Sequence, residues 1–76
     1  IYVCGNGGSA AISNHYVCDY LKFLRQNTKI KPKVISLSNN IETITAISND
    51  FNYDQIFKYQ VESLLEKNDL LIIISS

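Results

Sequence analysis

The chain has 76 residues, 46% of them hydrophobic, and its seven basic and seven acidic residues cancel. This balance lacks the basic footprint of a nucleic-acid-binding protein, so we expect no nucleic-acid partner. The longest apolar run, residues 70–74, is far shorter than the roughly 20 residues that span a bilayer, and we expect no membrane role.

The first part of the chain predicts a strand, a glycine-rich turn and a long helix. The apolar run 1–4 stops at Gly5, which is typical of a buried strand. Residues 10–25 then follow a helical pattern, and a polar loop ends at Pro32, the single proline. The apolar residues expected on the inner face of this helix are Ala11, Cys18, Leu21 and Leu24.

The second part predicts a strand, two helices and another strand. Residues 34–37 read as a strand, and residues 38–40 as a turn that caps a helix running from Ile41 to about Ser48. After a break at 49–52, Asp54 is expected to cap a helix that ends near residue 65. The last strand covers residues 70–74. The inner side of the final helix is expected to carry Phe57, Val61, Leu64 and Leu65.

The order strand, helix, strand, helix, helix, strand predicts an α/β fold. This alternation builds a parallel sheet with helices on both faces, a three-layer Rossmann-like arrangement. The strands are uniformly apolar, as expected when both faces are covered. A chain this short has a marginal core, and it stops directly behind an apolar run. We therefore expect residues 1–76 to be the N-terminal part of a larger domain.

The cysteines and the basic residues suggest no special chemistry by themselves. Cys4 and Cys18 are both expected to be small core residues, which fits a reducing cytosol and a cytoplasmic protein. A basic stretch follows the first helix, and it is either a solvated helix end that complements the dipole or an anion-binding patch. Its members are Lys22, Arg25, Lys29, Lys31 and Lys33.

Small, uncharged polar residues follow all three predicted strands, at 5–9, 38–40 and 75–76. In a parallel sheet these positions meet at the edge where ligands bind. Such groups offer both donors and acceptors to sugar hydroxyls. The turn at 5–9 also precedes a helix whose free N–H groups favour an anion, with Ser9 expected at or near the N-cap, where it caps the helix or donates to a phosphate.

The glycine turn has two other possible interpretations, a dinucleotide-binding loop and a turn that only joins a strand to a helix. Gly5, Gly7 and Ala10 match a loose dinucleotide-binding pattern, but that pattern requires an acidic residue after the second strand. The chain has Ser38, Asn39 and Asn40 there, so the dinucleotide interpretation is rejected. A turn that only joins strand to helix stays open as an alternative.

His15 and Asp19 are four residues apart on the first helix, so their side chains share a face. A histidine and a carboxylate at this spacing suit a divalent metal ion. They equally suit a proton-transfer couple or a plain structural pair. All three interpretations remain open from the residues alone.

Several segments of the chain form a pattern that is typical of one family. The motif Cys-Gly-Asn-Gly-Gly-Ser at 4–9 is followed by His15 six residues after the serine. The pattern continues at 46–51 (Ala-Ile-Ser-Asn-Asp-Phe), at Phe57, at 60–62 and at 69–75. Together these segments resemble the phosphoheptose isomerase branch of the SIS (sugar isomerase) family. The resemblance covers essentially the whole chain, and the first motif with the Asn-Asp segment is its specific part.

This resemblance implies an aldose–ketose isomerase that converts sedoheptulose 7-phosphate to D-glycero-D-manno-heptose 7-phosphate in bacterial heptose synthesis. It implies a homotetramer with sites between subunits. The positions that match the family's substrate-binding residues are Asn6, Gly7, Gly8, Ser9, Asn49, Asp50, Ser75 and Ser76. Ser9 would lie beside the phosphate, and Ser75 and Ser76 would open a serine-rich phosphate loop.

The resemblance also implies zinc or another divalent metal, with His15 as the first ligand. Asp19 departs from the pattern, because the family usually has Glu there as metal ligand and catalytic base. Asp is one methylene shorter, and small displacements of a catalytic group lower the rate strongly. His15 and Asp19 are thus the expected catalytic and metal-binding pair. A non-catalytic phosphosugar-binding module or a protein-interaction SIS module is the alternative.

Overall fold

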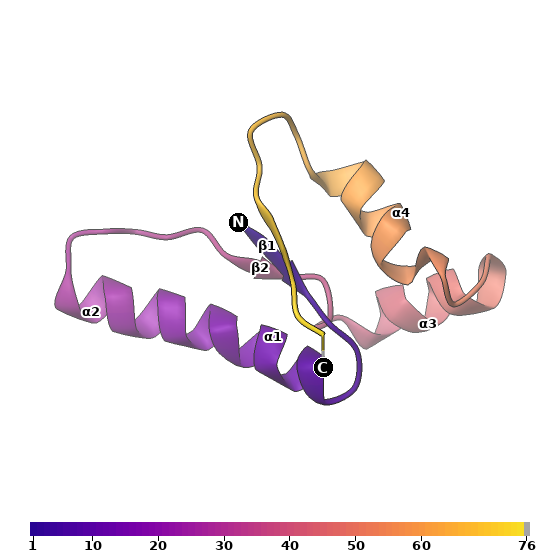
Figure 1. Ribbon diagram of the computed structural model, residues 1–76, viewed down its shortest axis with the longest axis horizontal. Helices are drawn as coiled ribbons and strands as arrows, with labels where there is room; N and C mark the ends of the chain where they lie inside the picture. Colours follow the sequence, from indigo (N-terminus) through magenta and orange to yellow (C-terminus); the bar gives the residue numbers. More distant parts are fainter. Residues whose placement is uncertain (76) are drawn as a thin grey trace.

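The computed structural model describes residues 1–75 and confirms the α/β alternation (Figure 1). The first part comprises β1 (Tyr2–Cys4), α1 (Gly8–Cys18), a π-helical segment η1 (Asp19–Leu24) and α2 (Arg25–Asn27). The second part comprises β2 (Ile35–Ser36), α3 (Ile41–Asp50), α4 (Gln55–Leu64) and β3 (Leu71–Ile73).

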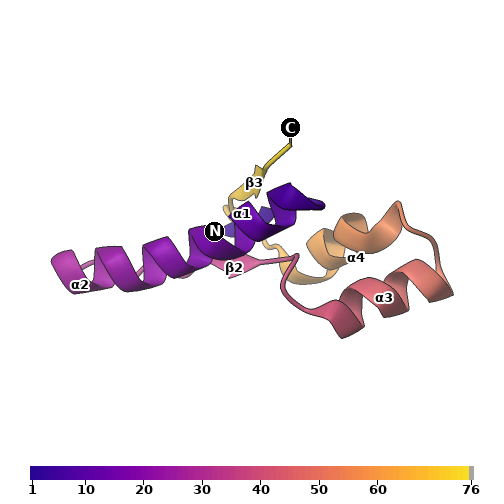
Figure 2. The same ribbon diagram turned by 90° about the horizontal axis from the view of Figure 1, so that it is seen from below.

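The three strands form one parallel sheet in the order β2-β1-β3. Val3 of the central strand pairs with Ser36 on one side and with Ile72 on the other. The chain therefore passes from β1 to β2 at one edge of the sheet and then crosses over β1 to β3 at the other edge. Because such crossovers are right-handed, a change of direction puts the connecting helices on opposite faces. In Figures 1 and 2 the α1–α2 helix and the α3–α4 pair extend to opposite sides of the strands.

The core lies around the central strand and the residues that cover it. Val3 is fully buried and Cys4 is 2% exposed, as expected for a strand with neighbours on both edges. The other buried apolar side chains come from the end of β2 and from α3 and α4: Leu37, Ile47 and Ile56. The expectation that Cys4 is a core residue is confirmed.

The long first helix begins at Gly8, earlier than the predicted Ala10, and its inner face differs from the expected one. Ala11, Cys18 and Leu21 are exposed, so the prediction that they face the core is wrong. The residues that turn inward are Ser13, Tyr16, Val17, Tyr20 and Leu24, and only Leu24 was expected there. Ile12 and Phe23 are also exposed, which leaves apolar side chains all around this helix, so apolarity alone did not identify its inner face.

A serine can occupy the core side of α1 because its hydroxyl is satisfied. Ser13 is fully buried, and its Oγ donates a hydrogen bond to the carbonyl oxygen of Ser9 at 2.8 Å. A buried hydroxyl with a partner avoids the desolvation penalty of an unpaired one. Next to it, Ser36 Oγ donates to Asn14 Oδ1 at 2.6 Å and ties β2 to α1.

The expected inner side of α4 is confirmed in part, because Phe57, Val61 and Leu65 are half-buried. Ile56 and Gln60 are the buried residues of α4, whereas Leu64, expected inside, is 47% exposed. Gln60 Nε2 donates to the carbonyl oxygen of Leu37 at 3.0 Å and to that of Ile56 at 3.1 Å. This side chain therefore fastens α4 to the end of β2.

The helix starts agree partly with the sequence. Asn40 caps α3 as expected, since its Oδ1 accepts a bond from the Thr43 N–H at 2.8 Å. Asp54 occupies the N-cap position of α4, but its side chain makes no capping bond. α3 runs through Asp50 instead of ending at Ser48, so the predicted break begins later than expected.

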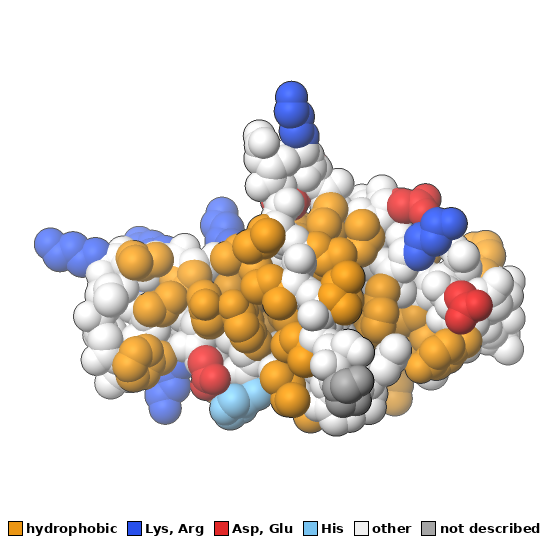
Figure 3. Space-filling view, viewed as in Figure 1, with side chains coloured by type: hydrophobic (Ala, Val, Ile, Leu, Met, Phe, Trp, Pro, Cys, Tyr) orange, Lys and Arg blue, Asp and Glu red, His pale blue; other side chains and the backbone are white. Residues whose placement is uncertain are grey.

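Apolar side chains remain uncovered over the strands and along the first helix (Figure 3). Ile73 of β3 is 70% exposed and Phe23 of η1 is 64% exposed. Within residues 1–75, no helix combines the length and apolarity needed to cross a membrane.

Candidate functional site

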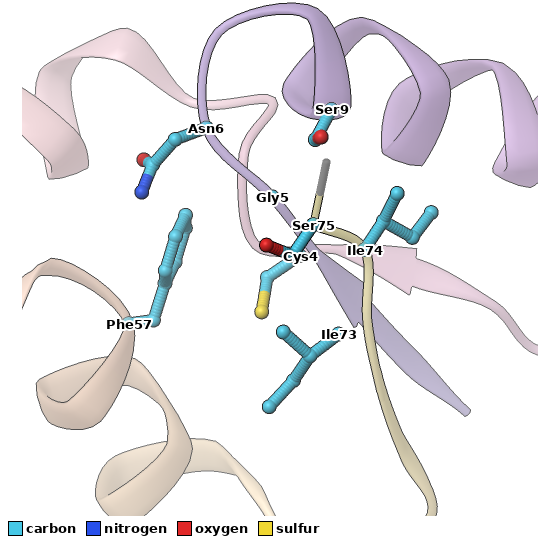
Figure 4. A pocket seen from close by; sticks show the side chains of 8 residues that line it. All are labelled: Cys4, Gly5, Asn6, Ser9, Phe57, Ile73, Ile74 and Ser75. Carbon is cyan, nitrogen blue, oxygen red and sulfur yellow. The ribbon is translucent and has the colours of Figure 1, made fainter.

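The strand order brings the loop after β1 and the loop after β3 to one point. A pocket of about 230 Å³ opens there between β1, β3, the start of α1 and α4 (Figure 4). This is the place where the direction of winding reverses, and ligands of open α/β sheets bind at such a point, beyond the carboxyl ends of the strands. Its lining residues are Cys4, Gly5, Asn6, Ser9, Phe57, Ile73, Ile74 and Ser75.

Gly5 allows the strand and the helix to meet closely. A Cβ atom at this position would lie 2.7 Å from the carbonyl oxygen of Ser9, closer than real Cβ contacts. Ser38, from the turn after β2, holds the same residue, since its Oγ accepts from the Gly5 N–H at 3.1 Å and donates to the Gly5 carbonyl at 2.7 Å. The uncharged turn after β2 therefore positions the glycine loop, and Ser38 has a structural role.

The helix that follows is open to an anion at its N-terminus. Gly7 is the N-cap residue with φ of 55°, a conformation that glycine adopts without strain, and no side chain of the described residues caps the helix. Within residues 1–75 the N–H groups of Gly7 and Gly8 have no hydrogen-bond acceptor. Free N–H groups at a helix N-terminus attract anions.

Ser9 lies in the first turn of α1, two residues after the N-cap Gly7, so the expected position near the N-cap is confirmed. Its N–H donates to the Asn6 carbonyl at 2.9 Å. Its side chain lines the pocket (Figure 4). Of the two roles that the sequence left open for this hydroxyl, capping is not seen within residues 1–75, and donation to a phosphate stays a prediction.

Three further residues shape the pocket. Phe57 projects from α4, and in Figure 4 its ring extends toward the side chain of Asn6. Ser75 follows β3 at the other side of the pocket. Phe57 was expected on the inner side of its helix and matches the family resemblance, but no residue pattern indicates which turn of α4 approaches the glycine loop. Ser76 lies outside the described residues.

The thiol of Cys4 contributes no charge to this pocket. Burial raises its pKa, because a thiolate would be poorly solvated there. The described lining contains no Lys, Arg, Asp or Glu. Binding of an anionic ligand would thus depend on N–H and hydroxyl donors.

His15 and Asp19 lie together on the exposed side of the first helix, as the sequence predicted. His15 Nε2 is 3.3 Å from Asp19 Oδ1, and their side chains are 73% and 62% exposed. Two ligands of one tetrahedral ion, each about 2.0–2.1 Å from it, lie about 3.4 Å apart. The imidazole and the carboxylate therefore fit a divalent ion in distance and in donor type.

Cys18 joins this pair, contrary to the expectation that it is a core residue. It is exposed, and the ligand atoms of His15, Cys18 and Asp19 all lie within 4.8 Å of one another. Its apolar neighbours in the sequence had suggested an inward face. The i, i+3, i+4 spacing from His15 was the signal that could have found it.

Asn49 and Asp50 lie apart from the pocket. They are the last residues of α3, both are exposed, and Asn49 Nδ2 donates to Asp50 Oδ1 at 3.4 Å. Neither residue lines the pocket at the strand ends. Among the residues predicted to bind substrate, the pocket brings together Asn6, Ser9 and Ser75, with Gly7 and Gly8 in the adjoining turn.

Comparison with known proteins gives consistent matches over this whole region. The SIS domain family model matches residues 1–76. The chain is 43% identical to the phosphoheptose isomerase of Helicobacter pylori over all of this chain and 39% of that protein. It is 42% identical to the phosphoheptose isomerase of Aliarcobacter butzleri, over all of this chain and 40% of the relative. The chain thus spans about two fifths of the length of these relatives.

Solved structures agree with the fold. The phosphoheptose isomerase GmhA from Neisseria gonorrhoeae superposes with a TM-score of 0.85 at 32% identity, over 99% of this chain and 37% of that one. A phosphoheptose isomerase from Francisella tularensis gives a TM-score of 0.79 at 34% identity, over 95% of this chain and 35% of that one.

Proposed function

The chain belongs to the SIS domain family, and on this premise we propose that the complete protein is an aldose–ketose isomerase acting on a sugar phosphate. The observation that carries the proposal is a pocket beside the start of α1, where the N–H groups of Gly7 and Gly8 have no acceptor within residues 1–75. An exposed His15–Asp19 pair lies further along the same helix. The relatives named phosphoheptose isomerase support the proposal.

The pocket is assigned to the phosphate end of the substrate. Its volume of about 230 Å³ is below the roughly 300–1,000 Å³ of sites that enclose a whole small ligand. The N–H groups of Gly7 and Gly8 and the hydroxyl of Ser9 would bind phosphate oxygens, with Ser75 opposite them. Ser76 is proposed to extend that serine side of the site.

The sugar chain is proposed to run along α1 toward Asp19. At 1.5 Å per residue, His15 lies about 9 Å and Asp19 about 15 Å along the helix axis from Ser9. This separation suits an extended, open-chain sugar phosphate with its phosphate at one end and its carbonyl at the other. Asn6 would orient hydroxyls near the phosphate. Sedoheptulose 7-phosphate, converted to D-glycero-D-manno-heptose 7-phosphate, is the proposed substrate.

Asp19 is the proposed base. Ketose-to-aldose conversion removes a proton from C1 while the C2 carbonyl becomes an enediolate oxygen. The proton of the C1 hydroxyl then moves to that C2 oxygen, and a proton returns to C2 as the C1 oxygen forms the new carbonyl. The Asp19 carboxylate would take and return that proton, and His15, 3.3 Å away, would orient it. His15 and Asp19 would hold zinc or another divalent ion, which would supply Lewis-acid stabilisation of the enediolate oxygen.

The remaining parts of the site are assigned to other subunits. Asn49 and Asp50 are exposed at the end of α3, away from the pocket of their own chain. We propose that the protein is a cytoplasmic homotetramer and that this pair completes the sugar site of a neighbouring copy. The exposed apolar residues along the first helix would supply the contact surface.

Turnover of sedoheptulose 7-phosphate by the full-length protein tests the role of Asp19. Asp19→Asn removes the base but keeps the shape, so kcat should fall by about 10²–10⁴-fold. Asp19→Glu keeps the carboxylate but moves it by one methylene, so it should lose less activity than Asp19→Asn. The control is Glu62→Gln, an exposed carboxylate on α4 that should leave the rate unchanged. Unchanged turnover in Asp19→Asn would remove this residue from the mechanism.

The non-catalytic alternative is favoured by one observation, the shorter Asp at position 19 where the resembled family has Glu. A phosphosugar-binding or protein-interaction module would bind the sugar phosphate, or a protein, without converting it. Calorimetric binding of the sugar phosphate by a wild-type protein that shows no turnover would establish this alternative.

A further inference from the structure

We propose that Cys18 is a third ligand in the metal site, so that His15, Cys18 and Asp19 form a mixed nitrogen, sulfur and oxygen site selective for zinc. The inference rests on the proposed function in placing a metal ion at the His15–Asp19 pair. It adds a ligand that neither the sequence pattern nor the family resemblance assigned.

Helix geometry places the three groups together. Residues at i, i+3 and i+4 lie on one face of a helix, and Cys18 and Asp19 take those positions relative to His15. The His15 and Asp19 atoms are already 3.3 Å apart. The sulfur lies within 4.8 Å of both, whereas in a tetrahedral zinc site it would be about 3.6 Å away. Rotations of the exposed side chains that move the sulfur by about an ångström close that difference.

Side-chain length explains why Cys18 can reach the ion. A cysteine sulfur is only one bond beyond its Cβ atom, so it binds only an ion that lies close to the helix. Asp19 is shorter than Glu by one methylene and would hold the ion closer to the backbone. The aspartate that departs from the resembled pattern therefore brings the ion within reach of Cys18.

The backbone changes at the same place. The π-helical segment η1 starts at Asp19, directly after Cys18, and the Asp19 N–H contacts the carbonyl oxygens of both His15 and Tyr16. Short π-helical segments inside α-helices occur frequently at functional sites. This change in helix type at the junction of the ligands is independent of their side-chain distances.

The surroundings leave the ion accessible. All three side chains are exposed, and they share a hollow of about 290 Å³ with Lys22, Phe23 and Gln26. The positive charge of Lys22 would repel a metal ion there, but its long flexible side chain can place the ammonium in solvent. Three protein ligands leave a fourth position of a tetrahedral ion for substrate oxygen or a ligand from elsewhere in the protein.

The ligand set predicts metal preference. Thiolate sulfur favours zinc over magnesium, calcium and manganese, which prefer all-oxygen sites. Cys4, the other cysteine, is buried in β1, outside this cluster, and serves as the internal control.

The experiment loads the full-length, metal-stripped protein with Co²⁺ as a spectroscopic probe and with Zn²⁺ for affinity. Wild type should show a sulfur-to-cobalt charge-transfer band in the near ultraviolet. Cys18→Ser should lose that band and bind zinc at least about tenfold more weakly, since even outer-shell partners contribute about 10–100-fold to affinity. Cys4→Ala, with folding verified by circular dichroism, should keep both properties.

The outcomes separate this inference from the proposed function. Cobalt bound without a sulfur band, or a band that persists in Cys18→Ser, overturns the assignment of Cys18 while leaving the isomerase and its His15–Asp19 pair in place. An active protein that binds neither metal also overturns it. Loss of the band in Cys18→Ser alone supports it, whether or not the protein turns over the heptose phosphate.

Discussion

At Gly5 the end of β1 and the first turn of α1 approach so closely that a single added methyl group has no room. Gly8, three residues later, has open space around its missing side chain and no positive φ. The two glycines of one motif therefore have different physical roles. Gly5 permits the close packing that forms the pocket, and Gly8 supplies an N–H group whose function does not require glycine.

This contrast gives a prediction for stability. Gly5→Ala should destabilise the protein by about 1–3 kcal/mol or more, because its Cβ would strike the Ser9 backbone. Gly8→Ala should be neutral or stabilising by about 0.4–1 kcal/mol, since alanine restricts the unfolded chain. Chemical denaturation of the two variants measures the difference. Equal stability of the two would contradict the close approach at Gly5.

At the scale of elements, Gln60 links α4 to the sheet. It is 8% exposed, and its amide bonds to the carbonyl oxygens of Leu37 and Ile56. The turn that follows Leu37 carries Ser38, which holds the glycine loop. A chain of hydrogen bonds thus runs from α4 through the end of β2 to the pocket.

Loss of this link should lower the free energy of unfolding. Gln60→Ala leaves the Leu37 carbonyl without its amide donor and opens a void, so we expect a loss of about 1–3 kcal/mol. The exposed Glu62→Ala on the same helix should change stability by no more than about 0.5 kcal/mol. Thermal or urea unfolding of the full-length protein compares them. A Gln60 variant as stable as the Glu62 variant would show that the link contributes nothing.

At the scale of the whole molecule, the uncovered apolar side chains call for a partner surface. Ile12, Leu21 and Phe23 are each more than half exposed on the first helix. Apolar surface of this kind marks contact with other parts of a protein or with other subunits. The proposed homotetramer would bury it.

A charge placed on that surface should disrupt the assembly. Phe23→Glu should convert the full-length protein to a smaller species, measured by light scattering after size-exclusion chromatography, because an unpaired carboxylate is costly to bury. Lys29→Glu, in the exposed polar loop, is the control and should leave the assembly intact. An unchanged mass in Phe23→Glu would exclude this surface from the interface.

The sequence by itself determined the order of elements and the chemistry of the first turn. Apolar runs, glycines and caps are local signals, so β1, the turn at 5–9 and the Asn40 cap of α3 could be read directly. The proximity of His15 and Asp19 was equally local, because one helix fixes their spacing. These properties depend on neighbours only a few residues away.

Only the tertiary structure decided which distant segments meet. The strand order β2-β1-β3 places Ser75 and Phe57 beside the glycine loop, and no local pattern specifies that order. The inner face of α1 and the position of Leu64 on α4 were misjudged for the same reason. Burial of Ser13 and Gln60 depends on carbonyl partners that satisfy them, whereas exposure of Cys18 follows from how the helix packs on the sheet. Packing against distant segments, not the apolarity of individual residues, selected these faces.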